Sequence, residues 1–396
     1  MSDYPSAEAN LTTMVAPVGS HWAQNDRLRE EHAVYWNTYG NGYWVITRAD
    51  EIREASQNPA VFSNHSIVAT DPDPAYRFLP SFVDPPQHMK YRKPLNRWFS
   101  PPSVNALGPK LRECATMTLQ EFAADGRTDY VKSFGDYYPV RVFLTSMGLP
   151  LDHARFLVSC VRRMSGKRSG SPEDTAQMMG AWNDIAAFWT GLLSERRSEP
   201  LDPDADFVSY IMRATIDDHP FADDEIIDTL VTLTLGSLDT LKAQFGWCIY
   251  HFATHPDDRR RIVEDPGLIP DAVEEIMRAY PIVGMGRKLT QDIEFHGCPM
   301  KKDQMLYLNL PSATRDPRDF PGADQVIIDR TPNRHVAFGA SEHRCVGSHL
   351  ARAEMSVALE EWHAAIPDYR IDGDEPLMAI GGTIALLSLP LVWDPC

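Results

Sequence analysis

The chain has 396 residues, of which 43% are hydrophobic and 23% are charged, and its formal net charge is −17. This length and balance are typical of a globular protein with one large core or two modest domains. The negative charge disfavours a nucleic acid as partner, because phosphate groups bind to clustered cations. A local basic patch for an acidic protein partner is compatible with the acidic total.

The cysteines and the hydropathy pattern predict a cytoplasmic protein. The first residues are polar and acidic, so no secretory signal is expected. No stretch of about 18 uncharged apolar residues occurs, so no membrane span is expected. The cysteines are widely scattered, which favours a reducing compartment over a disulfide framework. They are Cys114, Cys160, Cys248, Cys298, Cys345 and Cys396.

The N-terminal part of the chain predicts a leader, a hairpin and a first helix. We expect a loose N-terminal leader over residues 1–24 and a single domain over residues 25–396, because no repeat or flexible linker divides the chain. Residues 33–47 predict a β-hairpin, since Asn41-Gly42 stands between arms rich in Tyr, Trp and Val. Helical spacing begins after Asp84-Pro85-Pro86.

The rest of the chain predicts successive helices and short β-segments, so the fold class is mainly α with minor β. The longest helix candidate begins near Asp223, where acidic residues suit the helix dipole, and ends near Thr254. It is apolar on more than one face, as is typical of a helix that crosses the interior of a large protein. Three elements follow it: a helix that ends at Tyr280-Pro281, β-segments over residues 287–310, and a small sheet over residues 377–392.

One cysteine stands in a segment that suits a metal-bound thiolate. Residues 338–347 place Cys345 at the start of a predicted helix, directly after His343 and Arg344 and between glycines. Helix-start N–H groups and nearby cations keep a sulfur deprotonated, and glycines let the backbone approach a flat macrocycle such as heme. Two alternatives stay open. In the first, Cys345 is a buried core residue. In the second, it forms a zinc site with His343 and His349, and the lack of any CxxC pair disfavours this site.

A second pattern predicts a buried ionic network. Glu275 and Arg278 share one helix face and can pair. Arg330 precedes the cysteine segment, so an Arg–Glu–Arg network would pin this segment against the helix. The alternative is a solvated surface pair.

A third pattern lies inside the long helix, at Gly236-Ser237-Leu238-Asp239-Thr240. A glycine in a helix interior costs about 1 kcal/mol, so we expect something flat or bulky to pack there, or the helix to open locally. The adjacent acid and alcohol would relay protons. The alternative is a Thr240 hydroxyl bonded to its own helix, with Asp239 at the surface.

With these three motifs in this order, the chain resembles a bacterial cytochrome P-450, a heme-thiolate monooxygenase, over roughly residues 33–393. The camphor-hydroxylase-like branch is the most similar in three places: the substrate-covering residues 75–80 and 84–86, the helix motif 236–240, and the ending 389–393. The resemblance implies the cytochrome P-450 fold, a helix-rich domain plus a small β-sheet region. It also implies heme b (iron protoporphyrin IX) as cofactor.

The resemblance implies roles for named residues. Cys345 is the implied iron ligand, and Phe338 would pack beneath the heme near the sulfur. Cations and N–H donors around a carboxylate would hold the heme propionates: these are His343, Arg287, Arg92 and His88. Asp239 and Thr240 are the implied catalytic residues, which guide protons to dioxygen. Glu275, Arg278 and Arg330 would be structural.

The resemblance also implies a substrate pocket. Its residues would be Tyr76, Leu235, Gly236, Val283, Met285 and Thr383, and core packing is the alternative for each. The tyrosine that matches Tyr76 in the camphor-type enzyme bonds a substrate oxygen, and one hydroxyl fixes orientation well in an apolar pocket. We therefore expect a small apolar substrate of the terpenoid class.

Electrons are expected from outside the chain. The sequence has no GxGxxG motif and no cysteine set for an iron–sulfur cluster. The resemblance implies a separate iron–sulfur ferredoxin with an NAD(P)H-dependent reductase. We expect a basic docking patch for this partner at Lys90, Lys93, Arg97 and Arg344. The alternative is that these residues are ordinary solvated cations.

Three residues depart from the family pattern. Ser341 stands where a glycine is usual in the cysteine loop, and Ser237 replaces the more usual Gly or Ala in the long helix. Lys242 stands where a small or apolar residue is normal. Because a buried lysine is costly unless paired, we expect it to pair with Asp239 or another nearby acid and to perturb proton delivery.

The expected function is the insertion of one oxygen atom of O2 into a C–H bond. One alternative is a peroxide-driven heme enzyme, which would not need the Asp239-Thr240 relay. The other is a heme sensor or carrier without turnover.

Overall fold

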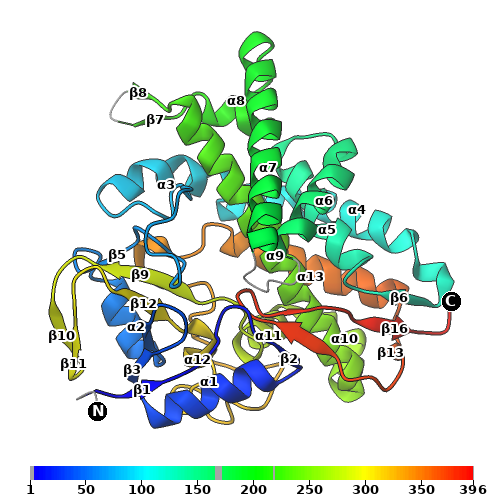
Figure 1. Cartoon of the computed structure of the whole chain (residues 1–396). Helices are drawn as coiled ribbons and strands as arrows, with labels where there is room; N and C mark the ends of the chain where they lie inside the picture. Colours follow the sequence, from blue (N-terminus) through cyan, green and yellow to red (C-terminus); the bar gives the residue numbers. More distant parts are fainter. Residues whose placement is uncertain (1–3, 166–171, 217–218, 396) are drawn as a thin grey trace.

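Helices dominate the protein and surround one long central helix (Figure 1). The structure is a computed structural model that describes residues 4–165, 172–216 and 219–395. Its helices are α1 (Ser20–Glu31), α2 (Ala49–Ser56), α3 (Gln87–Trp98), α4 (Pro101–Gln120), α5 (Phe134–Met147), α6 (Ala154–Ser165), α7 (Pro172–Ser198), α8 (Phe207–Ile211), α9 (Asp223–Thr254), α10 (Pro256–Glu264), α11 (Ile269–Ala279), α12 (Leu310–Ala313) and α13 (Ser348–Ala365).

The long helix α9 organises the helical region. It is an unbroken helix of 32 residues with three acidic residues in its first turn, and most of its side chains are buried. Helices α5, α6, α7 and α11 pack against it, while α13 packs mainly against α4. The predicted helix from about Asp223 to Thr254 is confirmed, as is the predicted interior position. The mainly α fold class with minor β is confirmed as well.

The largest sheet lies beside the helices and carries one of the candidate heme residues. Its strand order is β1-β3-β4-β12-β9-β5. The predicted hairpin over residues 33–47 is the antiparallel pair β3–β4, in which Trp36 faces Trp44. Arg287 lies on β9, opposite Leu306 of β12. The strands are β1 (Ser6–Ala7), β3 (Val34–Asn37), β4 (Tyr43–Ile46), β5 (Phe62–Ser63), β9 (Met285–Leu289) and β12 (Met305–Leu308).

The smaller sheets join distant parts of the chain. Three-stranded sheets have the orders β13-β16-β6 and β15-β14-β2, and two hairpins are β10–β11 and β7–β8. Their strands are β2 (Val15–Pro17), β6 (Arg127–Asp129), β7 (Thr215–Ile216), β8 (His219–Pro220), β10 (Ile293–Phe295), β11 (Cys298–Met300), β13 (Arg370–Ile371), β14 (Met378–Ile380), β15 (Ala385–Leu386) and β16 (Pro390–Val392). The predicted small sheet over residues 377–392 is therefore present.

The prediction of a loose leader over residues 1–24 is wrong for its described part. Strand β1 pairs with β3, and β2 pairs with β14, so that Val15 faces Ile380. Leu11, which lies between β1 and β2 in the chain, is buried, and α1 already begins at Ser20. Both pairings satisfy backbone N–H and C=O groups through partners that lie outside the leader, which local sequence patterns do not reveal.

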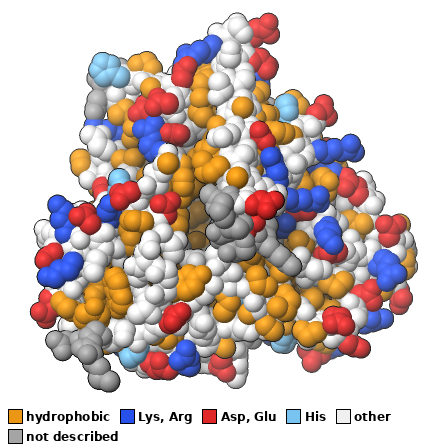
Figure 2. All heavy atoms as spheres, viewed as in Figure 1, with side chains coloured by type: hydrophobic (Ala, Val, Ile, Leu, Met, Phe, Trp, Pro, Cys, Tyr) orange, Lys and Arg blue, Asp and Glu red, His pale blue; other side chains and the backbone are white. Residues whose placement is uncertain are grey.

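The main hydrophobic core lies among the helices, and two smaller clusters lie against the large sheet. Hydrophobic side chains also border a recess near the centre of the face drawn in Figure 2. Within the described ranges, no helix is both long enough and apolar enough to cross a membrane.

Candidate active site

The loop before α13 carries Cys345 and is folded by two left-handed residues. Gly339 has φ of 76° and Ser341 has φ of 64°, a region that favours glycine. Ser341 therefore adopts the conformation that the usual glycine would take. The loop then closes when the Cys345 N–H donates to the Phe338 carbonyl at 2.9 Å. These bonds set the cysteine at the entrance of α13.

The Cys345 thiol is the exposed one among the described cysteines, whereas Cys114, Cys160, Cys248 and Cys298 are buried. This exposure contradicts the core-residue alternative for Cys345. Desolvation raises the pKa of the Cys345 thiol, while the Gly347 N–H and the charges of Arg92, Arg344 and Arg352 act to lower it. Cys345 is thus an exposed residue whose thiol feels the positive charge of three arginines.

The ring of Phe338 lies in the same loop, under a cation. The Arg352 guanidinium carbon is 4.5 Å from the ring centroid, within the range of a cation–π contact. Arg352 is itself held by Glu274, which also contacts His335. Phe338 is therefore fixed beside the cysteine by its own loop and by α13.

Four nitrogen-bearing side chains from three parts of the fold meet near Cys345, and we call His88, Arg92, Arg287 and His343 the cationic cluster. The His88 and His343 rings lie 3.8 Å apart, centroid to centroid. Arg92 donates to the backbone carbonyl of Arg344, which ties α3 to the cysteine loop. The charges of His88, Arg287 and Arg92 all act on His343. The structure thus brings together the four residues that the resemblance implies for the heme carboxylates.

No ion pair joins the cationic cluster to an acid within the described ranges, although the charge of Asp84 acts on Arg287 and His88. Both ring nitrogens of His88, and Nε2 of His343, are buried without a hydrogen-bond partner there. Arg287 is 5% exposed and donates from Nη1 to the Gly286 carbonyl at 2.7 Å. Burial lowers the pKa of Arg287 to about 10, and burial with the charge of Arg92 lowers the pKa of His88 to about 4. Buried donors of this kind are costly unless an acceptor binds them.

These donors fit the carboxylate groups of heme b. Carboxylate oxygens would accept hydrogen bonds from the orphaned nitrogens and would balance the guanidinium charges. The Cys345 sulfur lies in the same loop as His343. A ligand that carries both a metal ion able to bind sulfur and carboxylate groups therefore matches this set of side chains. The zinc alternative lacks a ligand set, since no group of three or more His, Cys, Asp and Glu side chains within residues 4–165, 172–216 and 219–395 could hold a metal ion.

The acid–alcohol pair lies at the middle of α9. The Thr240 hydroxyl donates to the Gly236 carbonyl at 2.5 Å, and the helix does not open there. The expected local opening is therefore wrong, and the alternative of a back-bonded Thr240 is correct. Gly236 is nevertheless exposed, and a side chain added to it would meet no atom within 4 Å. A flat group can pack against this bare stretch of helix.

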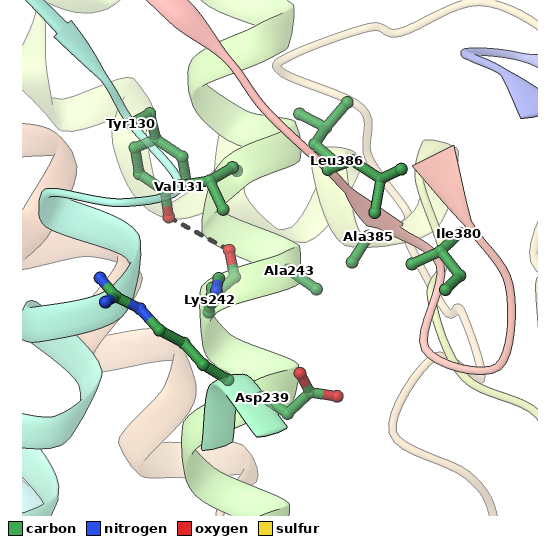
Figure 3. Close-up of a pocket in the computed structure, with 11 residues that line it drawn as sticks. Tyr130, Val131, Asp239, Lys242, Ala243, Ile380, Ala385 and Leu386 are labelled. Atoms are coloured by element: carbon green, nitrogen blue, oxygen red, sulfur yellow. Dashed lines mark hydrogen bonds between the residues drawn. The ribbon is translucent and has the colours of Figure 1, made fainter. Parts of the chain in front are cut away.

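Asp239 is half-buried rather than a surface residue, and it lines a cavity beside α9 (Figure 3). Thr240 follows it directly in the helix, where successive side chains point about 100° apart. The pair therefore connects the cavity with the side of the helix that bears Gly236.

The predicted substrate residues fall into three groups. Val283 pairs with Thr383 in an isolated β-bridge, and Met285 follows at the start of β9. Leu235 and Gly236 lie together on α9. Tyr76 lies in an aromatic cluster with Phe78, Phe82 and Trp182 of α7, with its ring centroid 5.2 Å from that of Trp182.

Sequence reasoning missed the partners of this Tyr76 segment. Arg77 forms ion pairs with Asp224 at 3.0 Å and with Asp228 at 2.6 Å, both on α9. Trp182 comes from α7, more than a hundred residues away in the chain. The acidic start of α9 was the available signal, but its i, i+4 carboxylates had no evident partner in the sequence.

The predicted Arg–Glu–Arg network is present, and we call Glu275, Arg278, Arg330 and Asn333 the Glu275 cluster. Glu275 accepts from Arg278 Nε at 2.8 Å and from Arg330 Nε at 2.9 Å. Its side chain and that of Arg278 are fully buried, which contradicts the solvated-pair alternative. The Ile327 N–H and the Asn333 amide complete the carboxylate's bonds. The segment that leads into the cysteine loop is thereby fixed to α11.

Lys242 pairs with an acid that the sequence did not identify. Its Nζ lies 2.5 Å from Oδ1 of Asp136, in the first turn of α5. The prediction that this lysine is paired is confirmed, with the open choice settled in favour of another nearby acid. Arg162 binds the other carboxylate oxygen of Asp136 at 2.6 Å.

Comparison with known proteins agrees with this geometry. A family model described as cytochrome P-450 matches residues 170–266 and 267–362. The mycinamicin IV hydroxylase/epoxidase of Micromonospora griseorubida is 31% identical over 372 residues, which cover 90% of each chain. The crystal structure of CYP101J2 superposes with a TM-score of 0.88 at 26% identity, over 98% of this chain and 97% of that chain. The crystal structure of CYP101C1 gives 0.87 at 27% identity, over 100% and 98%.

The two solved structures represent the camphor-hydroxylase-like branch, which the sequence motifs also indicate. The fold, the cysteine loop, the cationic cluster and these likenesses lead to one conclusion. The chain belongs to the cytochrome P-450 family of heme monooxygenases.

Proposed function

We propose that this cytochrome P-450 inserts one oxygen atom of O2 into a C–H bond of a small apolar substrate, with Cys345 as the proximal ligand of heme b. The other oxygen atom leaves as water, with two electrons and two protons supplied from outside. When bound, heme b supplies the activation of dioxygen and the oxidation of the C–H bond. The observation that carries the proposal is the set of buried, orphaned nitrogens around an exposed cysteine.

The cationic cluster would hold the heme carboxylates. His343 and Arg287 would donate directly, and His88 and Arg92 would complete the set from α3. The heme carboxylates would balance the guanidinium charges and favour the charged form of His88, which offsets the desolvation that lowers the pKa of His88 and of Arg287. Phe338 would pack under the macrocycle, and the Gly347 N–H would steady the sulfur.

Thr240 and Asp239 would move protons at the dioxygen side. The Thr240 hydroxyl can turn from the Gly236 carbonyl and hold a proton at Oγ1, on the bare face of α9. Asp239 would take protons from the cavity beside it and pass them to this face. A positioned general acid of this kind contributes roughly 10²- to 10⁴-fold to a rate.

We propose a terpenoid as the substrate class. Tyr76 brings a hydroxyl into an aromatic cluster, which suits a compact apolar molecule with one oxygen. Leu235, Gly236, Val283, Met285 and Thr383 would supply the apolar wall. The likeness to two structures of the camphor-hydroxylase-like branch supports this class.

We propose a ferredoxin with an NAD(P)H-dependent reductase as the electron source. Lys93, Arg97 and Arg344 are exposed, and the Arg92–Arg344 bond brings α3 beside the cysteine loop. Together with Lys90 they form a basic patch for an acidic partner, which steers association at low salt. A cytoplasmic location remains a prediction from the scattered cysteines.

The direct test is to titrate the ferric protein with camphor and limonene, and then to measure product with NADH, a surrogate ferredoxin and its reductase. We expect a low-to-high spin change with at least one terpenoid and hydroxylated product. The Thr240→Ala variant should consume NADH with less product, whereas Thr240→Ser should stay close to wild type. Product formed only with hydrogen peroxide would favour the peroxide-driven alternative. Ligand binding without any turnover would favour a sensor.

A further inference from the structure

A series of aromatic rings runs from the second half of α9 toward the protein surface. Trp247 of α9 is fully buried, and its ring centroid lies 4.6 Å from that of Trp22 in α1. Both tryptophans contact Tyr280, the residue that follows α11, at 5.2 Å for Trp22 and 5.8 Å for Trp247. The Tyr280 ring lies 5.9 Å from that of His251, which also belongs to α9. Four rings from three parts of the fold are therefore in contact, and we call them the aromatic series.

The buried end of the aromatic series lies close to the acid–alcohol pair. Trp247 follows Thr240 by seven residues of α9, which is two helical turns, so it lies roughly 10 Å along the axis and on almost the same side of the helix. The Trp247 indole N–H donates to the Ile384 carbonyl at 2.8 Å. Ile384 directly follows Thr383, which pairs with Val283 in the proposed substrate wall. Trp247 is therefore a neighbour of the proposed site of oxygen activation.

The other end of the aromatic series is a hydrogen-bonded tyrosine, histidine and aspartate. The Tyr280 oxygen lies 3.2 Å from His251 Nδ1, and His251 Nε2 lies 3.0 Å from Asp258 Oδ2. The bond from His251 lowers the pKa of the Asp258 carboxyl, so this group is ionised and can only accept. Burial lowers the pKa of His251, so its ring is neutral, with its proton on Nε2. Nδ1 therefore accepts from the Tyr280 hydroxyl.

These hydrogen bonds give Tyr280 a property that the two tryptophans lack. Burial raises the pKa of Tyr280, so its hydroxyl keeps its proton until the ring loses an electron. An oxidised phenol is a strong acid, and His251 is placed to take this proton while the Asp258 carboxylate balances the imidazolium. Trp22 and Trp247 donate their N–H groups to backbone carbonyls, which are very weak bases. The loss of an electron from the aromatic series is therefore most favourable at Tyr280.

We propose that Tyr280 is a redox-active tyrosine that reduces over-oxidised heme when no substrate is present. Tyr280 gives one electron, by way of Trp247, to heme that O2 or a peroxide has oxidised, and its hydroxyl proton passes to His251 Nδ1. The products are a neutral tyrosyl radical, a histidinium paired with Asp258, and heme that has gained one electron. One electron from an external reductant, such as a ferredoxin, and the proton on His251 then restore the phenol. The proposal rests on the proposed function, because it needs heme beside Thr240.

The test detects the radical directly. The heme-loaded ferric protein, without substrate, is mixed with a peracid, frozen rapidly and measured by electron paramagnetic resonance. We expect a tyrosyl signal that changes shape when the protein contains ring-deuterated tyrosine and that is lost in Tyr280→Phe. The signal should also be weaker in Trp247→Phe, whose ring is harder to oxidise. A signal that is unchanged in Tyr280→Phe, or no tyrosyl signal in the wild type, overturns the proposal.

A second variant tests the proton transfer and keeps every ring of tyrosine and tryptophan in place. His251→Asn removes the base that takes the Tyr280 proton, so the tyrosyl signal should be lost although Tyr280 is present. Asp258 is 22% exposed, and Asp258→Asn should weaken the signal less than His251→Asn does, because water also stabilises the histidinium. An undiminished signal in His251→Asn would overturn the role of the histidine.

The matched control is Tyr369→Phe. The Tyr369 hydroxyl lies 3.2 Å from Nε2 of His363, but Nδ1 of this histidine contacts the Leu359 carbonyl and not a carboxylate. The Arg259 guanidinium carbon is 4.9 Å from the Tyr369 ring centroid, and its charge opposes the loss of an electron. The control should keep the full tyrosyl signal. Loss of the signal in Tyr369→Phe, with its retention in Tyr280→Phe, would assign the radical to the wrong tyrosine and overturn the proposal.

The protective consequence and the proposed function are measured separately. Bleaching of the heme by the peracid should be faster in Tyr280→Phe than in the wild type and in Tyr369→Phe, because the oxidising equivalents then attack the heme itself. Equal bleaching rates would overturn the protective role. Product from camphor or limonene without a Tyr280 radical would overturn this inference and leave the proposed function intact. A Tyr280 radical without product from either probe would support this inference and count against the proposed substrate class.

Discussion

Two polar clusters involve the segment around Cys345, the Glu275 cluster before the cysteine loop and the cationic cluster at the loop itself, and they differ in how their charges are satisfied. In the Glu275 cluster, the carboxylate accepts from both arginines, from Asn333 and from a backbone N–H, and Arg278 also donates to the Ala323 and Gln325 carbonyls. In the cationic cluster, three buried ring nitrogens lack any hydrogen-bond partner within the described ranges. Both clusters use arginine and both are buried, yet only the first is complete.

The difference separates structure from ligand binding. A buried ion network whose donors and acceptors are matched stabilises one loop geometry. A buried group of donors without acceptors costs free energy in the protein alone, and this cost is recovered when an anionic ligand binds. The same residue type therefore indicates a structural role in Arg278 and a binding role in Arg287.

The largest effect is expected from breaking the complete cluster. Glu275→Gln leaves two buried guanidinium groups without their carboxylate, and breaking a buried pair costs roughly 3–5 kcal/mol. We expect this loss in the free energy of unfolding, measured by urea denaturation. The control is Glu31→Gln, which removes the surface pair with Arg27: the two side chains are 60% and 44% exposed, and the loss should cost about 1 kcal/mol at most. Equal losses in the two variants would show that the Glu275 cluster is not special.

A pH dependence should distinguish the incomplete cluster. Burial, and then the charge of Arg92, lower the pKa of His88 to about 4, so the neutral ring stabilises the fold above pH ~6.5 and this contribution is lost as the pH falls toward 4. The heme-free protein should lose roughly 3 kcal/mol of unfolding free energy over this interval through His88. His88→Gln should remove that loss, and heme should reduce it by favouring the charged ring.

His363 is the internal control for this pH measurement. Burial lowers its pKa to about 4 as well, but its ring nitrogens already contact the Leu359 carbonyl and the Tyr369 hydroxyl. The contribution of His363 to the pH dependence of the unfolding free energy, measured by comparing the wild type with His363→Gln, should be the same with and without heme. If heme changes both shares equally, the effect is general stabilisation and not binding at His88.

A smaller effect is expected in heme affinity. Arg287→Met should weaken heme binding by roughly 10- to 100-fold, the equivalent of a charged hydrogen bond of ~1.5–3 kcal/mol, without destabilising the heme-free protein. Arg259→Met should destabilise the heme-free protein and leave heme affinity unchanged, because Arg259 is buried and already donates to the Phe252 and Tyr369 carbonyls. Heme transfer to apomyoglobin and urea denaturation measure the two quantities. A destabilised heme-free Arg287→Met protein would contradict the comparison.

The smallest effect concerns the loop that joins the two clusters. Ser341 has φ of 64°, where a residue with a Cβ is strained by ~1–2 kcal/mol and glycine is not. Because glycine loses more entropy on folding, Ser341→Gly should stabilise the protein by at most about 1 kcal/mol. Ser341→Ala keeps the strain and should show no gain in thermal unfolding. A gain as large in alanine as in glycine would exclude backbone strain as its cause.

Local patterns were enough to predict several elements and the complete cluster. The acidic start and the apolar faces of α9 gave its bounds, and Asn41-Gly42 gave the β3–β4 hairpin. Glu275 and Arg278 lie on one helix turn, so their pairing was visible in the sequence. The position of Cys345 at a helix start was also local.

Contacts between distant residues could not be predicted in this way. Asp136 and Lys242 are 106 residues apart, and any of several acids could have formed the ion pair with the lysine. The pairing of β2 with β14 joins the two ends of the chain. The cationic cluster draws on α3, β9 and the cysteine loop, and only the family resemblance linked these residues before the structure did.

The central claim is that Cys345 binds the iron of heme b beside the cationic cluster. The most direct measurement is the absorption spectrum of the reduced protein under carbon monoxide, for the wild type, Cys345→Ser and the buried-cysteine control Cys298→Ser. We predict a Soret band at the thiolate-ligated position in the wild type and the control, and its loss in Cys345→Ser. A band at the histidine-ligated position in the wild type, or a thiolate band that survives in Cys345→Ser, would contradict the claim.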